Sequence, residues 1–98
     1  MSLPLILRPE AEQDIAEARD WYEQHRDGLG GEFLDEVEAC FARIRQFPES
    51  CAAGYRGVRP AKTRRFPYVA YYRIRAEVIE VLAVMHGSRH ERQWRSRI

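Results

Sequence analysis

The sequence predicts an α+β fold, in which an N-terminal strand and a helical hairpin precede a three-stranded antiparallel sheet. Two observations support this prediction. Apolar residues recur at helical spacing in two segments of the first half, whereas the second half contains runs of β-branched and aromatic residues. A chain of 98 residues can bury one hydrophobic core, so we expect one domain over residues 1–98.

The N-terminal segment predicts a strand that runs directly into a helix. Leu5 to Leu7 form a short apolar run, and Pro9 suits the first turn of a helix because its missing N–H would have no partner there. The apolar face of the helix is formed by Ala11, Ile15, Ala18, Tyr22 and His25. These positions alternate between spacings of four and three residues, so we expect a helix from Pro9 to about His25.

A second helix is expected after a glycine-rich turn. Residues Asp27 to Gly31 contain three glycines, so this segment should separate the two helices. The second helix should end near Phe47, since Pro48 disfavours its continuation. Its apolar stripe is formed by Phe33, Leu34, Val37, Phe41, Ile44 and Phe47. Two amphipathic helices joined by a short turn predict an antiparallel helical hairpin.

Three strands are expected in the second half of the chain. They cover Val58 to Phe66, interrupted by Pro60, then Tyr68 to Arg75, then Val78 to Met85. The last run is almost continuously apolar, which predicts a central strand buried on both faces. The helices should cover one face of the sheet. Because no further element is predicted to cover the other face, we expect a partner to bind there.

Charge is distributed unevenly along the chain. Residues 1–55 carry five basic and twelve acidic side chains, whereas residues 56–98 carry eleven basic and three acidic ones. Ten of those eleven are arginines, whose forked guanidinium group suits phosphate and carboxylate. The asymmetry predicts a polyanionic partner or an oppositely charged protein. Alternatively, the acidic helices and the basic sheet attract each other within one fold.

Several classes of protein are disfavoured by the sequence. No apolar segment approaches the length of a membrane span, and the N-terminus lacks the pattern of a secretion signal, so we expect a cytoplasmic protein with no membrane partner. Cys40 and Cys51 match neither a disulfide framework nor a zinc site. We find no Gly-rich phosphate loop, paired-carboxylate site or nucleophilic triad. We therefore expect no metal and no cofactor.

Four motifs resemble the RelE/ParE toxin superfamily, in the order of the predicted elements. Arg8–Ile15 resembles its strand-to-helix start, and Asp20–Val37 resembles the helical hairpin of ParE-like members. Arg64–Arg73 is similar to their central strand pair. Val81–Arg89, followed by Trp94, is similar to their last strand and tail. The resemblance covers nearly the whole chain and favours the ParE-like members.

The resemblance implies the toxin of a type II toxin–antitoxin pair. Such toxins are bound by an antitoxin, ParD-like in this case, whose extended C-terminal segment wraps the toxin. ParE-like toxins act on DNA gyrase, and RelE-like toxins cleave messenger RNA on the ribosome. We expect a ParE-like toxin that poisons gyrase and has no sequence-specific DNA binding of its own. The alternatives are a ribosome-dependent endoribonuclease and a non-toxic binding subunit.

A ribonuclease would need a base, an acid and cations that stabilise the phosphorane. The candidates are Lys62, Arg65, His86 and Arg89. Two departures count against this activity: Tyr68 stands where RelE-like members carry an arginine, and Trp94 and Arg95 stand where they carry a tyrosine. Indole does not titrate and guanidinium keeps its proton. His86 could exchange protons near neutral pH, or it could be a structural residue that forms hydrogen bonds with the tail.

A toxin without an active site would instead dock on its target through its basic sheet and tail. The expected target contacts are Arg59, Lys62, Arg64, Arg65, Arg89, Arg92 and Trp94. Large aromatic residues are enriched at protein interfaces, so the candidate antitoxin contacts are Trp21, Tyr22, Phe41 and Tyr71. Each of these four residues could equally belong to the hydrophobic core.

Overall fold

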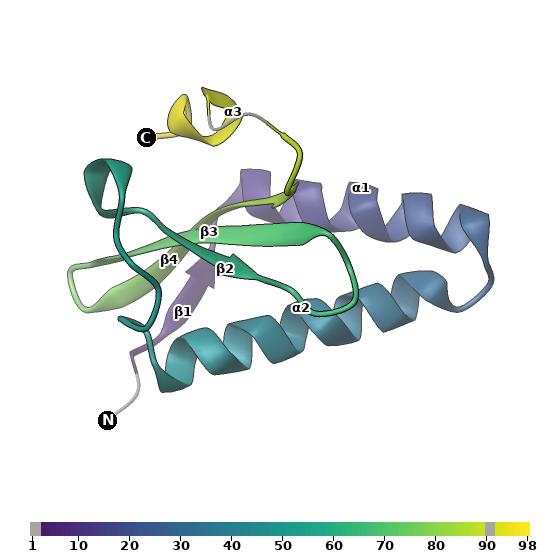
Figure 1. The fold of residues 1–98 in the computed structure, drawn as a ribbon, viewed down its shortest axis with the longest axis horizontal. Coiled ribbons are helices and arrows are strands. Elements are labelled where there is room, and N and C mark those ends of the chain that lie inside the picture. The colour runs from purple at the N-terminus through teal and green to yellow at the C-terminus, as the bar shows by residue number, and fades with distance from the viewer. Residues whose placement is uncertain (1–2, 90–91) are drawn as a thin grey trace.

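A computed structural model describes residues 3–89 and 92–98 of the chain, and Figure 1 shows its fold. The order of elements is strand, two helices, three strands and a short terminal helix. Their bounds are β1 Leu5–Leu7, α1 Pro9–His25, α2 Leu29–Gln46, β2 Arg59–Lys62, β3 Tyr68–Arg75, β4 Val78–His86 and α3 Arg92–Arg95, with a 3₁₀ turn at Tyr55–Gly57. The predicted α+β class is confirmed, and α3 is an addition that the sequence did not reveal.

All four strands form one sheet in the order β1-β4-β3-β2. Strands β2, β3 and β4 are antiparallel, as predicted, and β4 lies in the interior of the sheet. The N-terminal strand joins them as a fourth member, parallel to β4, with Leu5 opposite Ile79. The sequence pattern did not indicate this pairing, which brings the beginning of the chain next to its last strand.

Helices α1 and α2 form the predicted hairpin and cover one face of the sheet (Figure 1). The expected five-residue turn is wrong, because α2 begins at Leu29 and includes Gly30 and Gly31. Of the three glycines in the expected turn, only Gly28 has a left-handed backbone, with φ +85°. Gly30 lies inside α2, and a side chain is excluded there because a Cβ would be 2.8 Å from the carbonyl oxygen of Arg19 on α1. The glycine therefore permits close packing of the helices.

The larger core lies between the helices and the sheet. An aromatic cluster fills its centre, with Phe33 between Tyr22, Phe66 and Tyr68 at centroid distances of 5.1 to 5.4 Å. The buried members of this core are Ala11, Ala18, Phe33, Val37, Cys40, Phe41, Ile44, Ala61, Phe66, Ala70, Tyr72, Ile79, Val81 and Val84. The apolar stripes of the helices therefore pack on the inward-facing residues of the strands, as the helical and strand periodicities predicted.

A β-bulge determines which side chains of β4 enter each of the two cores that cover its faces. The register shifts between Tyr71, opposite Ala83, and Tyr72, opposite Val81, so that Leu82 is an extra residue. Val81 and Val84 consequently pack in the same core, although a regular strand would place positions three apart on opposite faces. Leu82, Ala83 and Met85 pack on the opposite face.

The chain itself covers that opposite face, which corrects the expectation of an exposed sheet. Trp94 of α3 is buried there and stacks on Tyr71 at 5.1 Å between ring centroids, and Ile98 packs nearby. In Figure 1, α3 lies across the sheet from α2. The sequence did not indicate that the tail covers this face of the sheet, because the tail is mostly polar and Trp94 is its one large apolar residue that is buried there.

Strand β2 is shorter than expected and lies at the other edge of the sheet. Pro60 is tolerated within it because an edge strand has no neighbour on one side. Cys40 and Cys51 both have free thiols. Among the described residues, no helix is long and apolar enough to cross a bilayer.

Candidate functional site

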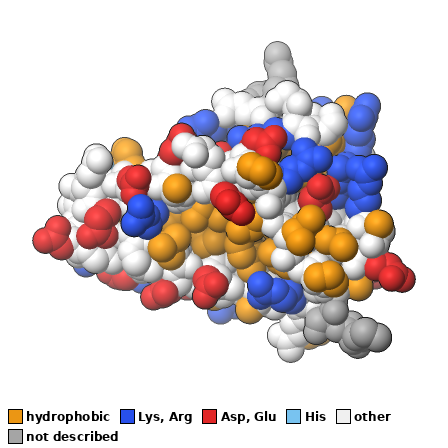
Figure 2. Space-filling model, turned by 180° about the vertical axis from the view of Figure 1, so that it is seen from behind, with side chains coloured by type: hydrophobic (Ala, Val, Ile, Leu, Met, Phe, Trp, Pro, Cys, Tyr) orange, Lys and Arg blue, Asp and Glu red, His pale blue; other side chains and the backbone are white. Residues whose placement is uncertain are grey.

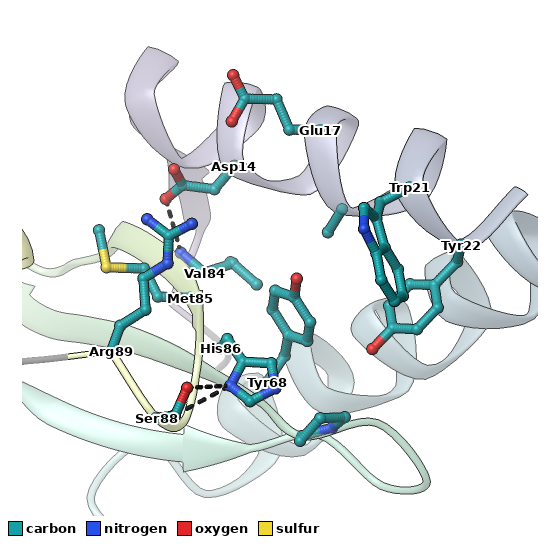
Figure 3. A pocket seen from close by; sticks show the side chains of 12 residues that line it. Asp14, Glu17, Trp21, Tyr22, Tyr68, Val84, Met85, His86, Ser88 and Arg89 are labelled. Atoms are coloured by element: carbon teal, nitrogen blue, oxygen red, sulfur yellow. Dashed lines mark hydrogen bonds between the residues drawn. The ribbon is translucent and has the colours of Figure 1, made fainter. Parts of the chain in front are cut away.

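Two grooves flank helix α1. The first, called the aromatic groove, has a volume of about 620 Å³ and lies between α1 and the ends of β3 and β4. Its lining consists of Asp14, Glu17, Ala18, Trp21, Tyr22, Pro67, Tyr68, Val84, Met85, His86, Ser88 and Arg89. Figure 3 shows the acidic side chains on the helical wall and His86, Ser88 and Arg89 across from them.

The aromatic wall of this groove is ordered by ring contacts. Trp21 is 54% exposed but stacks on His25 at 3.7 Å, and the ring Nδ1 of His25 is 2.7 Å from the carbonyl oxygen of Trp21. Tyr22 meets Trp21 edge-on at 5.1 Å and Tyr68 at 6.0 Å. Burial raises the pKa of Tyr68, as does Asp14, and outweighs the opposite influence of Arg89, so its hydroxyl stays protonated at neutral pH.

His86 lies at the floor of the groove with a defined tautomer. Its Nδ1 accepts a hydrogen bond from the backbone N–H of Ser88 at 3.1 Å and is 2.7 Å from the hydroxyl oxygen of Ser88. Because a backbone N–H can only donate, Nδ1 must carry a lone pair, and the neutral ring is protonated at Nε2. His86 therefore offers a donor at Nε2 while its basic nitrogen is engaged locally.

Asp14 connects this groove to the C-terminal tail. Its carboxylate oxygens accept hydrogen bonds from the two terminal nitrogens of Arg97 at 2.6 and 3.0 Å, and one of them also accepts from the backbone N–H of Val84 at 3.0 Å. Arg97 also donates to the carbonyl oxygen of Leu82. Hydrogen bonding to Asp14 raises the pKa of Arg97 despite its burial. We call this connection the tail latch.

The predicted ribonuclease residues do not converge. His86 and Arg89 share the aromatic groove. Lys62 lies at the end of β2, and Arg65 follows in the β2–β3 loop, where it bonds Glu32 of α2 at 2.8 Å. Neither of these two residues lines the groove. The structure therefore brings together half of the predicted set, with Tyr68 as an additional polar group.

The predicted target-binding residues are distributed over several elements. Lys62, Arg64 and Arg89 are exposed, whereas Arg59 donates to backbone carbonyl oxygens, including that of Glu49 at 3.2 Å. Trp94 belongs to the core beneath the tail, so it presents little surface to a target. The side chain of Arg92 lies outside the described residues. Two arginines of the basic half, Arg65 and Arg97, are paired with carboxylates of the helices.

The second groove, called the acid-rimmed groove, lies between α1, α2 and the edge strand β1 and has a volume of about 560 Å³. Figure 2 shows hydrophobic side chains along its floor and acidic side chains on its rims. Its lining consists of Leu5, Leu7, Glu12, Ile15, Leu34, Asp35, Val37, Glu38, Phe41 and Arg45. The sequence did not reveal this groove, because its lining comes from three separate elements, β1, α1 and α2.

The four candidate antitoxin contacts occupy three places. Trp21 and Tyr22 line the aromatic groove, and Phe41 lines the acid-rimmed groove. Tyr71 packs against the second core beneath the tail. Three of these residues therefore lie in the two grooves on either side of α1, and the acid-rimmed groove is the more apolar of the two.

Comparisons with known proteins identify the fold. A chain from the chromosomal ParDE toxin–antitoxin system of P. aeruginosa superposes with a TM-score of 0.74 at 19% identity, covering 86% of this chain and 95% of that chain. A chain from the RelBE2 toxin–antitoxin complex of Mycobacterium tuberculosis superposes with a TM-score of 0.61 at 21% identity, covering 88% and 99% respectively. No curated protein matches the sequence significantly.

The order of elements and the two superpositions define a protein of the ParE/RelE toxin fold. The family model for the ParE toxin of the type II toxin–antitoxin system parDE matches residues 5–91. The chain therefore belongs to the ParE toxin family, as the sequence motifs indicated.

Proposed function

We propose that this chain is a cytoplasmic toxin that inhibits growth by poisoning DNA gyrase and is neutralised by a cognate ParD-like antitoxin. The match to the ParE family over residues 5–91 is the observation that carries this proposal. The dispersal of the ribonuclease candidates supports it, because Lys62 and Arg65 lie outside the groove that contains His86 and Arg89.

The acid-rimmed groove is the proposed seat of the antitoxin. Strand β1 ends the sheet, so an extended segment can pair with its outer edge and place apolar side chains on the groove floor. The rim carries Glu12, Asp35 and Glu38 against the single cation Arg45. The bound segment should therefore combine branched apolar anchors with flanking lysine or arginine.

Induction of the chain alone in bacterial cells tests the gyrase proposal. We expect growth arrest with gyrase-linked DNA breaks and an SOS response, and co-expression of the antitoxin from the neighbouring reading frame should restore growth. Growth arrest without DNA breaks would contradict the proposed target. A folded chain that causes no growth defect would instead favour the third class, a non-toxic binding subunit.

A ribosome-dependent endoribonuclease is the second candidate function. The observation in its favour is that Tyr68, His86 and Arg89 line one groove, where a hydroxyl, an imidazole and a cation could contact a phosphodiester. In this case, induction would yield cuts in ribosome-associated messenger RNA, and Arg89→Gln would lower cleavage about 10²-fold or more. Intact messenger RNA during growth arrest would exclude this candidate.

A matched pair of α2 variants tests the antitoxin seat. Leu34→Glu places a charge on the groove floor, and we expect it to weaken antitoxin binding by at least about 30-fold, as for a central contact. Ala42→Glu adds the same charge at an exposed position of the same helix outside the groove lining and should leave binding unchanged. Calorimetric titration of the purified proteins measures both affinities, and equal affinities would place the antitoxin elsewhere.

A further inference from the structure

The charges around the acid-rimmed groove are separated along its length. Glu12, Asp35 and Glu38 stand on its rims, and Arg45 is the single basic residue of its lining. Asp35 and Glu38 are three positions apart on α2, so their side chains are neighbours on one face of that helix. Arg45 follows Glu38 by seven positions, which is about 10 Å along the helix axis. The groove therefore has an acidic part and a basic end.

Glu12 belongs to the acidic part although it lies on the other helix. In the antiparallel hairpin, Arg19 of α1 is level with Gly30 of α2, since a Cβ on Gly30 would lie 2.8 Å from the carbonyl oxygen of Arg19. Glu12 precedes Arg19 by seven positions, and Val37 follows Gly30 by seven positions. Because both helices rise by the same amount per residue, Glu12 is about level with Val37, which also lines the groove. Carboxylates therefore stand on both rims at this level.

The basic end of the groove lies near the start of β1. Strand β1 leads directly into α1, so its last residue, Leu7, is close to the acidic part. Figure 1 shows the C-terminal end of α2 beside the start of β1, and both Leu5 and Arg45 line the groove. An extended segment that pairs with β1 therefore spans the distance between the acidic part, near Leu7, and the basic end, near Leu5.

The four charged side chains of the groove have no ionic partners of their own. All four are exposed, and no ion pair joins any of them to another described residue. Asp35 and Glu38 are like charges on one helix face, so they repel each other. A partner that supplies a cation beside these two residues and an anion beside Arg45 would offset the repulsion and complement both ends of the groove.

We propose that the antitoxin segment in this groove runs antiparallel to β1, with a basic side chain beside Asp35 and Glu38 and an acidic side chain beside Arg45. Arg45 is then the residue that determines the direction of the segment. The inference rests on the proposed function, in which the groove is the seat of the antitoxin. Antiparallel pairing is the slightly more stable arrangement of two strands, and in that direction the basic residue precedes the acidic one.

The geometry of a strand also fixes the spacing of these two charges. Side chains of an extended segment point alternately toward and away from the groove, at about 3.3 Å per residue. Along the axis of α2, Arg45 lies about 10 Å from Glu38 and about 15 Å from Asp35. An even separation of four positions spans about 13 Å and places a central apolar residue over the groove floor. The expected order is therefore basic, any residue, apolar, any residue, acidic.

Nuclear magnetic resonance titration of the full chain with end-blocked synthetic peptides tests direction and spacing. The first peptide has the order lysine, threonine, leucine, threonine, glutamate, and the second has the reverse order. We expect the first to bind at least about 3-fold more tightly, because only this order satisfies both charges in antiparallel pairing. One extra threonine before the glutamate should remove the advantage, since the acidic side chain then points away from the groove. A nitroxide at the C-terminus of the first peptide should broaden the amide signal of Arg45 more than that of Asp35.

Charge variants show whether Arg45 causes the preference. Arg45→Gln should weaken binding of the first peptide about 3-fold and change binding of the second less than about 2-fold. Arg45→Glu should reverse the preference, so that a peptide with lysine in place of the glutamate binds more tightly than the first peptide. Arg19→Gln removes an equal charge outside the groove lining and should change each affinity less than about 2-fold. Far-ultraviolet circular dichroism confirms that each variant is folded.

Specific outcomes would overturn the proposal. Equal affinities for the two peptide orders, or equal losses in Arg45→Gln and Arg19→Gln, would show that only composition or net charge matters, and stronger broadening at Asp35 would show a parallel segment. If Leu34→Glu abolishes antitoxin binding but Arg45→Glu changes neither antitoxin nor peptide binding, the proposed direction fails and the antitoxin seat stands. If the peptides bind in the predicted direction but no antitoxin binds the chain, the proposed function fails and the polarity of the groove stands.

Discussion

The two faces of the sheet are covered in different ways. On one face, α1 and α2 bury an aromatic cluster around Phe33 in a large apolar core. On the other face, a short tail buries Trp94 over a smaller core and is attached by the polar contacts of the tail latch. The first arrangement depends on apolar area, and the second depends on the precise geometry of a few charged groups. Substitutions should therefore affect the two faces to different extents and in different ways.

The largest effect is expected on the helical face. Phe33→Ala removes the centre of the aromatic cluster and leaves a cavity, so we expect the free energy of unfolding to fall by about 3–5 kcal/mol. Urea denaturation followed by circular dichroism measures the loss, which should affect the whole molecule. A loss below about 1 kcal/mol would show that the helical face can collapse around the cavity.

A smaller and local effect is expected from the tail latch. Asp14→Ala removes the acceptor for Arg97 and for the backbone N–H of Val84, which should cost about 1–3 kcal/mol in the opening of the tail. Hydrogen exchange should increase in residues 92–98 and hardly at all in α2. Glu17→Ala, an exposed neighbour on α1, is the matched control. Uniformly faster exchange would mean that the tail and the helices open together.

The tail side should also be the acid-sensitive part of the molecule. Burial alone would raise the pKa of Glu80, but hydrogen bonds from Arg73 at 2.7 Å and Arg8 at 3.1 Å outweigh burial and lower the pKa. Because the pKa of Glu80 is lower in the folded than in the unfolded chain, its ionised form stabilises the fold at pH values above its unfolded-state pKa, about 4.3. This contribution is lost as the pH falls through the folded-state pKa. We expect the wild type to lose stability below about pH 4.3 more steeply than Glu80→Gln, in urea titrations at several pH values. Parallel curves would contradict this.

The smallest effect is expected at Trp94. Its indole Nε1 is buried and has no hydrogen-bond partner among the described residues, so the N–H contributes no favourable contact there. Trp94→Phe retains an aromatic ring for Tyr71 and removes the unsatisfied donor, so the loss of volume should be largely offset. We expect a change below about 1 kcal/mol, measured by thermal unfolding. A loss as large as that of Phe33→Ala would show that the two faces are equally sensitive to volume.

Periodicity predicted the helical face well, since local sequence determines it. The bounds of β1, α1 and β3 follow from apolar runs and from Pro9. The apolar stripe of α2 identified four of its buried core residues, but Phe47, also assigned to the stripe, is 60% exposed just after the end of the helix. Gly30 was assigned to a turn because the sequence does not show that α1 passes close to its Cα. The position of β1 beside β4 was also not predictable, because a parallel pair has no local turn to mark it.

The tail side and the candidate site were predicted less well, because both depend on contacts between distant residues. Arg97 and Asp14 form an ion pair although 83 positions separate them in the sequence, and the spacing of neither residue indicates this contact. His86 and Arg89 were correctly placed near each other by their proximity in sequence, whereas Lys62 and Arg65 were grouped with them by charge alone. The acid-rimmed groove requires three separate elements, so no single motif identifies it.

The parallel pair of β1 and β4 has a consequence for synthesis. Leu5 can form its strand pairing only after the ribosome has synthesised Ile79, so the sheet cannot be completed before then. At about 5–20 residues per second, a ribosome needs on the order of several seconds to make the intervening chain. The nascent protein therefore remains incomplete until translation has almost ended. The edge of β1 on which we propose that the antitoxin binds is therefore set in the sheet only near the end of translation.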